Sequence, residues 1–208
     1  MQRDALAYTK KCDKCQKHSP IIHQLAIDLH PLTSPWPFVQ WGLDILDPFP
    51  KASSSRKFLL VTTDYFSKWV EVVPLVNIAD SNVKTFLWEN IVTRFRIPKM
   101  LVAYNGPEFK SRKIIKFYEK LGIWQSFSSV AHPQTNGQAK ASNKVILEGL
   151  KRRLEDAKGR WVKELPFVLW AFRTTPRRST GETTFSLAYG TKVVILLEVA
   201  FPHSEQRK

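Results

Sequence analysis

Three strand-like runs follow one another closely in the first half of the chain, and they constrain the fold more than any other feature. The runs cover residues 38–46, 57–66 and 68–75 and are rich in β-branched and aromatic residues. Such runs with short separations are typical of an antiparallel meander. We therefore expect three antiparallel strands at the start of the main domain.

Helical and strand-like segments alternate after these three strands. Pro107 near the start and Gly122 at the end frame one helix, and Pro166 is expected to kink the last helix or shift its start. This order predicts an α/β fold with a mixed five-stranded sheet flanked by helices. The expected segments are helices over 81–95, 107–122, 136–158 and 161–175, with strands over 99–104 and 123–128.

The chain is strongly basic, and its composition narrows the classes of partner. Its formal net charge is +14, while 43% of its residues are hydrophobic and seven are tryptophan. Such a chain can bury a substantial core, and its charge favours nucleic acid over a small-molecule substrate. An ordinary domain that is merely basic is the alternative. The sequence has no run of 18 apolar residues and no apolar signal-peptide core, so we expect an intracellular protein without a membrane partner.

Asp44 stands out because it interrupts the apolar strand run WGLDIL. Aspartate is depleted from strands, and burying an unpaired carboxylate costs free energy. Two interpretations follow. Asp44 belongs to a catalytic or metal-binding site, or it caps a turn or pairs with a nearby arginine.

Two positions that would complete a metal site beside Asp44 hold residues that are not acids. Mg²⁺ prefers oxygen ligands, usually a few carboxylates with water and phosphate oxygens. Two-metal phosphoryl transfer places both ions between such carboxylates. Further ligands would come from the end of the fourth strand and from the first turn of the long helix. Those places hold Tyr104 and Lys140.

Five motifs in a fixed order make nearly the whole chain, residues 1–200, resemble one known family. They are WGLDILDPFP, LVTTDYFSKWVEVVPL, YNGPEF, HPQTNGQAKASN and GRWVKELPFVLWAFRTTPRRSTGETTFSLAYG. Together they resemble the integrase catalytic core of gypsy-type LTR retrotransposons, especially plant elements. The resemblance implies a ribonuclease H-like fold, which agrees with the predicted order of strands and helices.

The resemblance also implies a DDE catalytic triad of two aspartates and a glutamate. Carried onto this chain, the first acidic position is Asp44, which is retained. The second position holds Tyr104, just before Asn-Gly, and the third holds Lys140, shortly after Gly-Gln. The 35 residues between Tyr104 and Lys140 match the spacing of the family. The frame is therefore kept while two of its three acids are replaced.

These replacements are expected to prevent catalysis. A tyrosine hydroxyl has an ordinary pKa of about 10 and is neutral near pH 7, so Tyr104 is a poor and bulky ligand. Lys140 brings a cation to the place of two divalent ions, and an ion pair with Asp44 could fill the site. Like charges about 4 Å apart repel by about 4 kcal/mol at intermediate dielectric. We expect neither Mg²⁺ nor Mn²⁺, the cofactors of the family, to bind productively; rewired ligands are the alternative.

The long helix and the loop before it carry the residues that the resemblance assigns to DNA. His132 either touches phosphate near the site or is a turn residue held by Pro133. The polar face of the helix either meets DNA, with its cations pairing with phosphates, or is solvated. The predicted nucleic-acid-binding residues are His132, Gln138, Lys140, Asn143, Lys144 and Lys151.

Cys12 and Cys15 are the only cysteines, and a C-x2-C pair is typical of metal ligands or free thiols. The resemblance implies an HHCC zinc site whose two histidines would precede Met1. His18 is too close to Cys15 to replace them, so the zinc site is incomplete and we expect no zinc. We interpret residues 1–20 as a truncated remnant of the HHCC domain, 21–38 as a linker, 39–200 as the integrase core-like domain and 201–208 as a tail.

Three functional hypotheses fit this sequence. The first is a degenerate integrase core that keeps its fold and its affinity for DNA but lacks strand-transfer activity. Single-base changes convert Asp codons to Tyr and Glu codons to Lys, which explains both replacements simply. The second is a non-catalytic DNA-binding or assembly module used by its host, and the third is an active polynucleotidyl transferase with rewired ligands. The resemblance also implies a nuclear location and a homo-oligomer.

Overall fold

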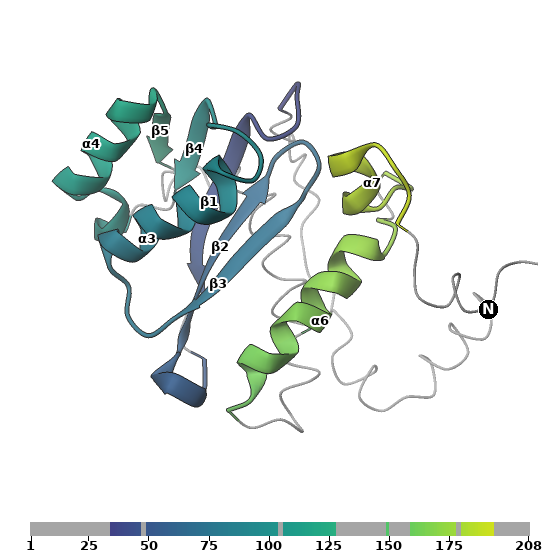
Figure 1. The fold of residues 1–208 in the computed structure, drawn as a ribbon, viewed down its shortest axis with the longest axis horizontal. Helices are drawn as coiled ribbons and strands as arrows, with labels where there is room; N and C mark the ends of the chain where they lie inside the picture. The colour runs from purple at the N-terminus through teal and green to yellow at the C-terminus, as the bar shows by residue number, and fades with distance from the viewer. Residues whose placement is uncertain are drawn as a thin grey trace, which may run out of the picture.

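The computed structural model describes residues 34–46, 49–103, 106–127, 149, 159–177 and 180–193. Five strands form one sheet in the order β3-β2-β1-β4-β5 (Figure 1). The first three strands are antiparallel neighbours, while β4 and β5 run parallel to β1. The strands are β1 (Gln40–Leu46), β2 (Phe58–Asp64), β3 (Val70–Leu75), β4 (Met100–Ala103) and β5 (Trp124–Phe127). The predicted meander and mixed five-stranded sheet are confirmed.

Helices flank this sheet, with α3 and α4 on one side and α6 on the side of β3 (Figure 1). Short helical turns connect the longer elements. The helices are α3 (Asp80–Leu87), α4 (Arg112–Leu121), α6 (Trp161–Thr174) and α7 (Thr184–Tyr189). The short turns are η1 (Ser53–Ser55) and η3 (Pro107–Phe109), which are 3-10 helices, and η2 (Trp88–Val92), which is a π-helix. Within the described residues, no helix is long and apolar enough to span a bilayer.

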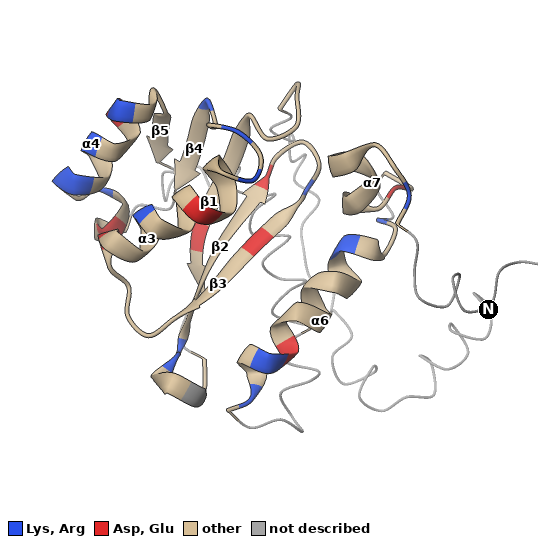
Figure 2. Ribbon diagram, viewed as in Figure 1, with Lys and Arg blue, Asp and Glu red and all other residues tan. Residues whose placement is uncertain are grey.

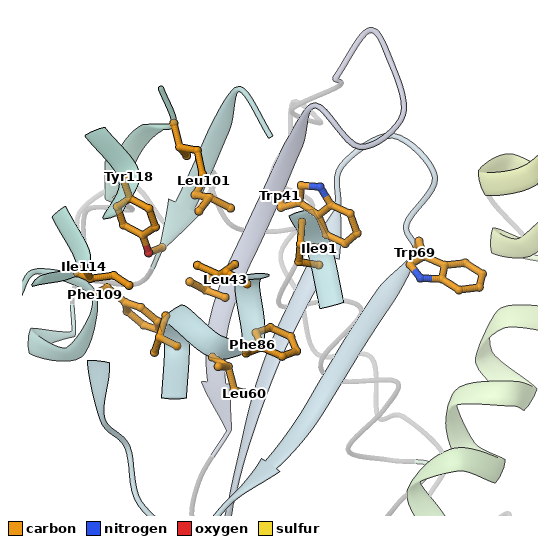
Figure 3. Packing of buried hydrophobic residues seen from close by; sticks show 14 residues of the cluster. Trp41, Leu43, Leu60, Trp69, Phe86, Ile91, Leu101, Phe109, Ile114 and Tyr118 are labelled. Atoms are coloured by element: carbon orange, nitrogen blue, oxygen red, sulfur yellow. The ribbon is translucent and has the colours of Figure 1, made fainter. Parts of the chain in front are cut away.

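The first of two cores lies between the sheet and the pair α3 and α4 (Figure 3). Trp41 and Leu43 of β1 are fully buried there against Phe86 of α3 and Ile114 of α4. A buried aromatic or aliphatic side chain contributes about 1.5–3 kcal/mol relative to an exposed one. Because odd-numbered residues of β1 face this core, the even-numbered ones lie on the opposite face of the sheet.

The second core lies between that opposite face and α6. Trp161, at the first position of α6, is fully buried with Leu59 and Val61 of β2. The indole Nε1 of Trp161 donates to the carbonyl of Pro50 at 2.7 Å, which satisfies its one polar atom. Helix α6 is continuous from Trp161 through Pro166 to Thr174, so Pro166 does not shift its start.

Two helices differ in extent from the ranges that the sequence predicts. The helix expected over 107–122 begins at Arg112, because Ser111 caps it by accepting the N–H of Ile114 at 3.2 Å. The helix expected over 81–95 keeps α-geometry only to Leu87 and continues as η2. Helix α7, which the periodicity analysis missed, is only six residues long. Apart from residue 149, the helix predicted over 136–158 lies outside the described residues.

Candidate functional site

Asp44 lies in β1 on the sheet face opposite α3 and α4. Its neighbours Leu43 and Ile45 pack into the first core, and side chains alternate along a strand. The Asp44 side chain is half-buried, and its Oδ1 accepts the N–H of Ile45 at 2.9 Å. Across the antiparallel pair it faces Val61. The sheet thus positions the Asp44 carboxylate on the face opposite α3 and α4.

The side chain of Tyr65 lies on the same face of the sheet as Asp44, and the negative charge of Asp44 affects its pKa. Tyr65 directly follows β2, is 1% exposed, and packs with Val102 and Met100 of β4. Burial raises the pKa of the Tyr65 hydroxyl above its ordinary value, and the negative charge of Asp44 raises this pKa further. A neutral, buried tyrosine therefore packs on β4 and lies within the electrostatic influence of Asp44.

The parallel pairing of β1 and β4 is described up to the residues that directly precede two predicted triad positions. The parallel pairing ends with Leu43 beside Ala103. Asp44 follows Leu43 in the sequence, and Tyr104 follows Ala103. The described ladder therefore ends one residue before each of these two positions.

The other predicted site residues fall on segments for which no structure is described. Tyr104 lies outside the described residues, as do the two cysteines Cys12 and Cys15. The same holds for the predicted nucleic-acid-binding residues His132, Gln138, Lys140, Asn143, Lys144 and Lys151. In the ranges that are described, no three His, Cys, Asp or Glu side chains gather in a group that could hold a metal ion. Asp44 is thus the one triad position that the structure places.

Asp64 is a second carboxylate in the sheet, but its contacts are those of a structural residue. It is fully buried, and both of its oxygens accept hydrogen bonds. Oδ1 accepts the N–H of Phe38 at 2.9 Å, while Oδ2 accepts the N–H and the hydroxyl of Ser67 at 2.7 and 2.6 Å. Burial raises the pKa of Asp64, and these hydrogen bonds oppose that shift. Asp64 ties the turn after β2 to the segment that leads into β1.

Glu71 on β3 is a charged centre that sequence reasoning missed. Its carboxylate is 6% exposed and lies 2.9 Å from Arg94 and 3.2 Å from Arg173 of α6. It also accepts the indole N–H of Trp69 at 2.7 Å, and Arg173 stacks over that indole at 4.3 Å. The depletion of acids from strands, which singles out Asp44, would also have found Glu71. Its partners make it a structural link between β3 and α6.

Glu108 is the described carboxylate nearest in sequence to position 104. It lies in η3, half-buried, and its carboxyl group lies against the backbone of Gly106. A Cβ at residue 106 would meet this carboxyl group, so glycine permits the close approach. The turn after β4 therefore carries an acid two residues beyond the Asn-Gly pair.

Comparison with known proteins identifies homologues of this chain. Residues 35–133 match the family model of the integrase core domain. The Gag-Pol polyprotein of woolly monkey sarcoma virus is 36% identical over 155 residues, 74% of this chain and 9% of that protein. The Gag-Pol polyprotein of avian reticuloendotheliosis virus is 28% identical over 198 residues, 95% of this chain and 17% of that protein. The chain thus spans less than a fifth of these polyproteins.

Solved structures share the fold at low sequence identity. An intasome of simian T-cell lymphotropic virus, in complex with the PP2A regulatory subunit B56 gamma, has a TM-score of 0.69 at 20% identity, covering 94% of this chain and 69% of that chain. The trimeric HTLV-2 integrase catalytic core domain in complex with magnesium has a TM-score of 0.60 at 19% identity, covering 77% of this chain and 100% of that chain. The described sheet and helices are the ribonuclease H-like fold of integrase catalytic cores.

Proposed function

We propose that this chain is the integrase core-like protein of a gypsy-type LTR retrotransposon, that it binds DNA, and that it does not catalyse strand transfer. The observation that carries the proposal is the sheet position of Asp44. This carboxylate directly follows Leu43, which pairs with Ala103, the residue before position 104. In the sequence the spacing of the family is kept, while positions 104 and 140 hold tyrosine and lysine.

The residues at these positions do not fit the magnesium that the HTLV-2 core binds. Asp44 alone supplies an anionic oxygen, whereas Mg²⁺ sites in proteins usually combine carboxylates with waters and substrate phosphates. Tyr104 contributes a neutral hydroxyl and Lys140 a cation. A lysine opposes two divalent ions and favours the anionic Asp44 instead. No metal-dependent step is therefore assigned to this chain.

DNA binding is supported by charge. The chain has 32 lysine and arginine residues against 18 acids, and a basic domain of this kind attracts phosphate backbones. We assign the contacts to His132, Gln138, Lys140, Asn143, Lys144 and Lys151. Lys140 then has two effects, since it adds a phosphate partner and removes a catalytic acid. A nuclear location follows from a DNA partner.

Self-association is the second part of the proposal. Trp170 of α6 is 49% exposed and lines a surface groove between α6 and β3. Exposed aromatic side chains are enriched at protein interfaces. The HTLV-2 core has been solved in dimeric and trimeric forms, which is consistent with an α6-mediated homo-oligomer here.

One observation favours the active alternative, in which other residues replace the lost ligands. The carboxyl group of Glu108 lies against Gly106, in the turn that follows position 104. An enzyme with rewired ligands would use Glu108 together with Asp44. In that case Glu108→Gln and Asp44→Asn would each abolish metal-dependent cleavage, whereas an inactive protein has no cleavage to lose.

The test combines DNA binding with DNA cleavage in one sample. The full chain is titrated into a fluorescein-labelled duplex in Mg²⁺ or Mn²⁺ buffer while anisotropy is recorded, and the DNA is then run on a denaturing gel. We expect salt-sensitive binding and an intact duplex. Failure to bind would overturn the DNA assignment, and nicking that Glu108→Gln removes would establish the rewired enzyme.

A further inference from the structure

A groove between α3 and α4 carries an unusual concentration of lysine. It has a volume of about 520 Å³ and is lined by Lys84, Trp88, Lys113, Lys116, Phe117, Lys120 and Leu121. Lys84 and Trp88 come from α3 and the start of η2, whereas the other five residues come from α4. Lysine and arginine residues follow the outer side of α4 (Figure 2). Two helices thus build one basic surface.

The charges of this groove are all of one sign. Its four lysines are exposed, and none of its seven lining residues is acidic. Lys113, Lys116 and Lys120 follow the spacing i, i+3 and i+7, which places them along one face of α4. Like charges in a row repel one another, so a polyanionic partner would relieve their repulsion.

The floor between these lysines is apolar. Trp88 is 47% exposed, while Phe117 and Leu121 are half-buried. The Nζ of Lys84 lies 5.7 Å from the centroid of the Phe117 ring, so the aliphatic stem of this lysine spans the gap between the helices. An apolar floor with a charged rim is the anatomy of a protein interface, in which aromatic anchors carry most of the binding energy.

We propose that this groove binds an acidic amphipathic segment of another protein. Apolar side chains of the segment would occupy the floor at Trp88, Phe117 and Leu121, and its carboxylates would face the four lysines. A nucleic acid duplex would match the lysines but, with its bases stacked inside, would leave Phe117 and Leu121 without an apolar partner. A single strand, whose bases stack on aromatic side chains, is distinguished by the test below. Charge complementarity and the apolar floor together therefore select an acidic peptide.

This groove is separate from the candidate active site. Helices α3 and α4 cover the sheet face of Leu43, whereas Asp44 lies on the opposite face. A peptide in the groove leaves the Asp44 face accessible, so the proposal goes beyond the integrase assignment and does not depend on it.

Binding is measured with the full chain and a fluorescein-labelled peptide of about four helical turns, roughly 14 residues. The peptide has leucine at i, i+3, i+4 and i+7 and glutamate elsewhere. We expect saturable binding that weakens at least about tenfold in Trp88→Ala and in the triple variant Lys113→Glu/Lys116→Glu/Lys120→Glu. These side chains are exposed, and circular dichroism verifies that each variant is folded.

Matched controls separate a built site from general charge attraction. The variant Lys51→Glu/Lys57→Glu/Lys163→Glu changes three exposed lysines elsewhere and should bind the peptide as the wild type does. Polyglutamate of equal length should bind much more weakly than the amphipathic peptide. The proposal fails if the peptide does not bind, if polyglutamate binds equally well, if both triple variants lose binding alike, or if only a single-stranded oligonucleotide depends on the groove.

Discussion

Leu43 of β1 and Ala103 of β4 are paired at the end of the parallel part of the sheet, and each directly precedes a residue of the predicted triad. Asp44 follows the first and Tyr104 follows the second. The backbone frame that would bring two acids together is thus retained up to the last described pair. In the proposed account, this chain differs from an active integrase in the chemistry of two side chains, Tyr104 and Lys140, and substitution can reverse that difference.

Tyr104 and Lys140 should weaken the binding of divalent metal ions. Calorimetric titration of Mn²⁺ into the wild-type chain should show no two-site binding in the micromolar range, because Lys140 opposes divalent cations and Tyr104 lacks a negative charge. The variant Tyr104→Asp/Lys140→Glu should bind about two equivalents. A two-site isotherm of the wild type that Asp44→Ala abolishes would contradict this expectation.

Asp64 should be important for stability rather than for catalysis. In Asp64→Ala, the half-buried N–H of Phe38 and the buried N–H of Ser67 lose their acceptor, and a buried group left unsatisfied costs about 1–3 kcal/mol. We expect a loss of about 3 kcal/mol in the free energy of unfolding, measured by urea denaturation. Ser67→Ala keeps both backbone contacts of Asp64. It removes the hydroxyl that donates to Asp64 and accepts the N–H of Trp69, and it should cost about 1–2 kcal/mol. Equal losses in the two variants would show that the backbone contacts of Asp64 contribute little.

Glu71, Arg94 and Arg173 form one cluster of charged side chains. Removing its buried carboxylate should destabilise the fold more than removing its exposed arginine. Glu71→Ala leaves the mostly buried Arg173 without its carboxylate, and breaking a buried pair costs about 3–5 kcal/mol. Arg94 is 44% exposed, so Arg94→Ala should cost less than about 1 kcal/mol. Thermal unfolding of both variants provides the comparison. A greater loss in the Arg94 variant would exclude burial as the reason that this cluster stabilises the fold.

Tyr118 offers a substitution that should stabilise the chain. Its side chain is 2% exposed, and no hydrogen-bond partner for its hydroxyl occurs among the described residues. Replacing a buried unsatisfied hydroxyl by hydrogen in Tyr118→Phe should raise the free energy of unfolding by about 1 kcal/mol. A destabilised variant would reveal a hydrogen-bond partner of the hydroxyl.

The stability gained by Tyr118→Phe should also depend on pH. Burial raises the pKa of the Tyr118 hydroxyl above its ordinary value of 10.0, so above about pH 10 the unfolded chain releases this proton while the folded chain keeps it. The unfolded state is then favoured as pH rises, whereas a phenylalanine at this position has no proton to release. The advantage of Tyr118→Phe over the wild type should therefore widen above about pH 10, as measured by urea denaturation, and a constant advantage would exclude the pKa shift.

The fold was predictable from the sequence because its strands are apolar runs and the apolar residues of its longer helices recur with helical spacing. The order of elements and the place of Asp44 within a strand follow from that pattern alone. The start of α4 does not, because Ser111 donates to Asp80, 31 residues away in the sequence, while capping the helix. Helix α7 is too short for periodicity to detect, although Thr183 and Gly190 are ordinary capping residues.

Only part of the candidate site could be predicted from the sequence. Tyr104 and Lys140 became interpretable through motif spacing, whereas the roles of Asp64 and Glu71 required their partners to be known. Phe38 and Arg173, which contact these two acids, lie 26 and 102 residues away along the chain. Long-range contacts of this kind leave no local pattern. The same holds for the lysine groove, which two helices form together.

The most direct measurement is a strand-transfer assay that compares the wild-type chain with Tyr104→Asp/Lys140→Glu in the presence of Mg²⁺. Duplexes with the ends of the element serve as donor, and a supercoiled plasmid serves as target. We expect no joined product from the wild type and measurable product from the double variant, because the substitutions supply carboxylates at the two proposed ligand positions. Joined product from the wild type, lost in Asp44→Ala, would contradict the proposed loss of catalysis.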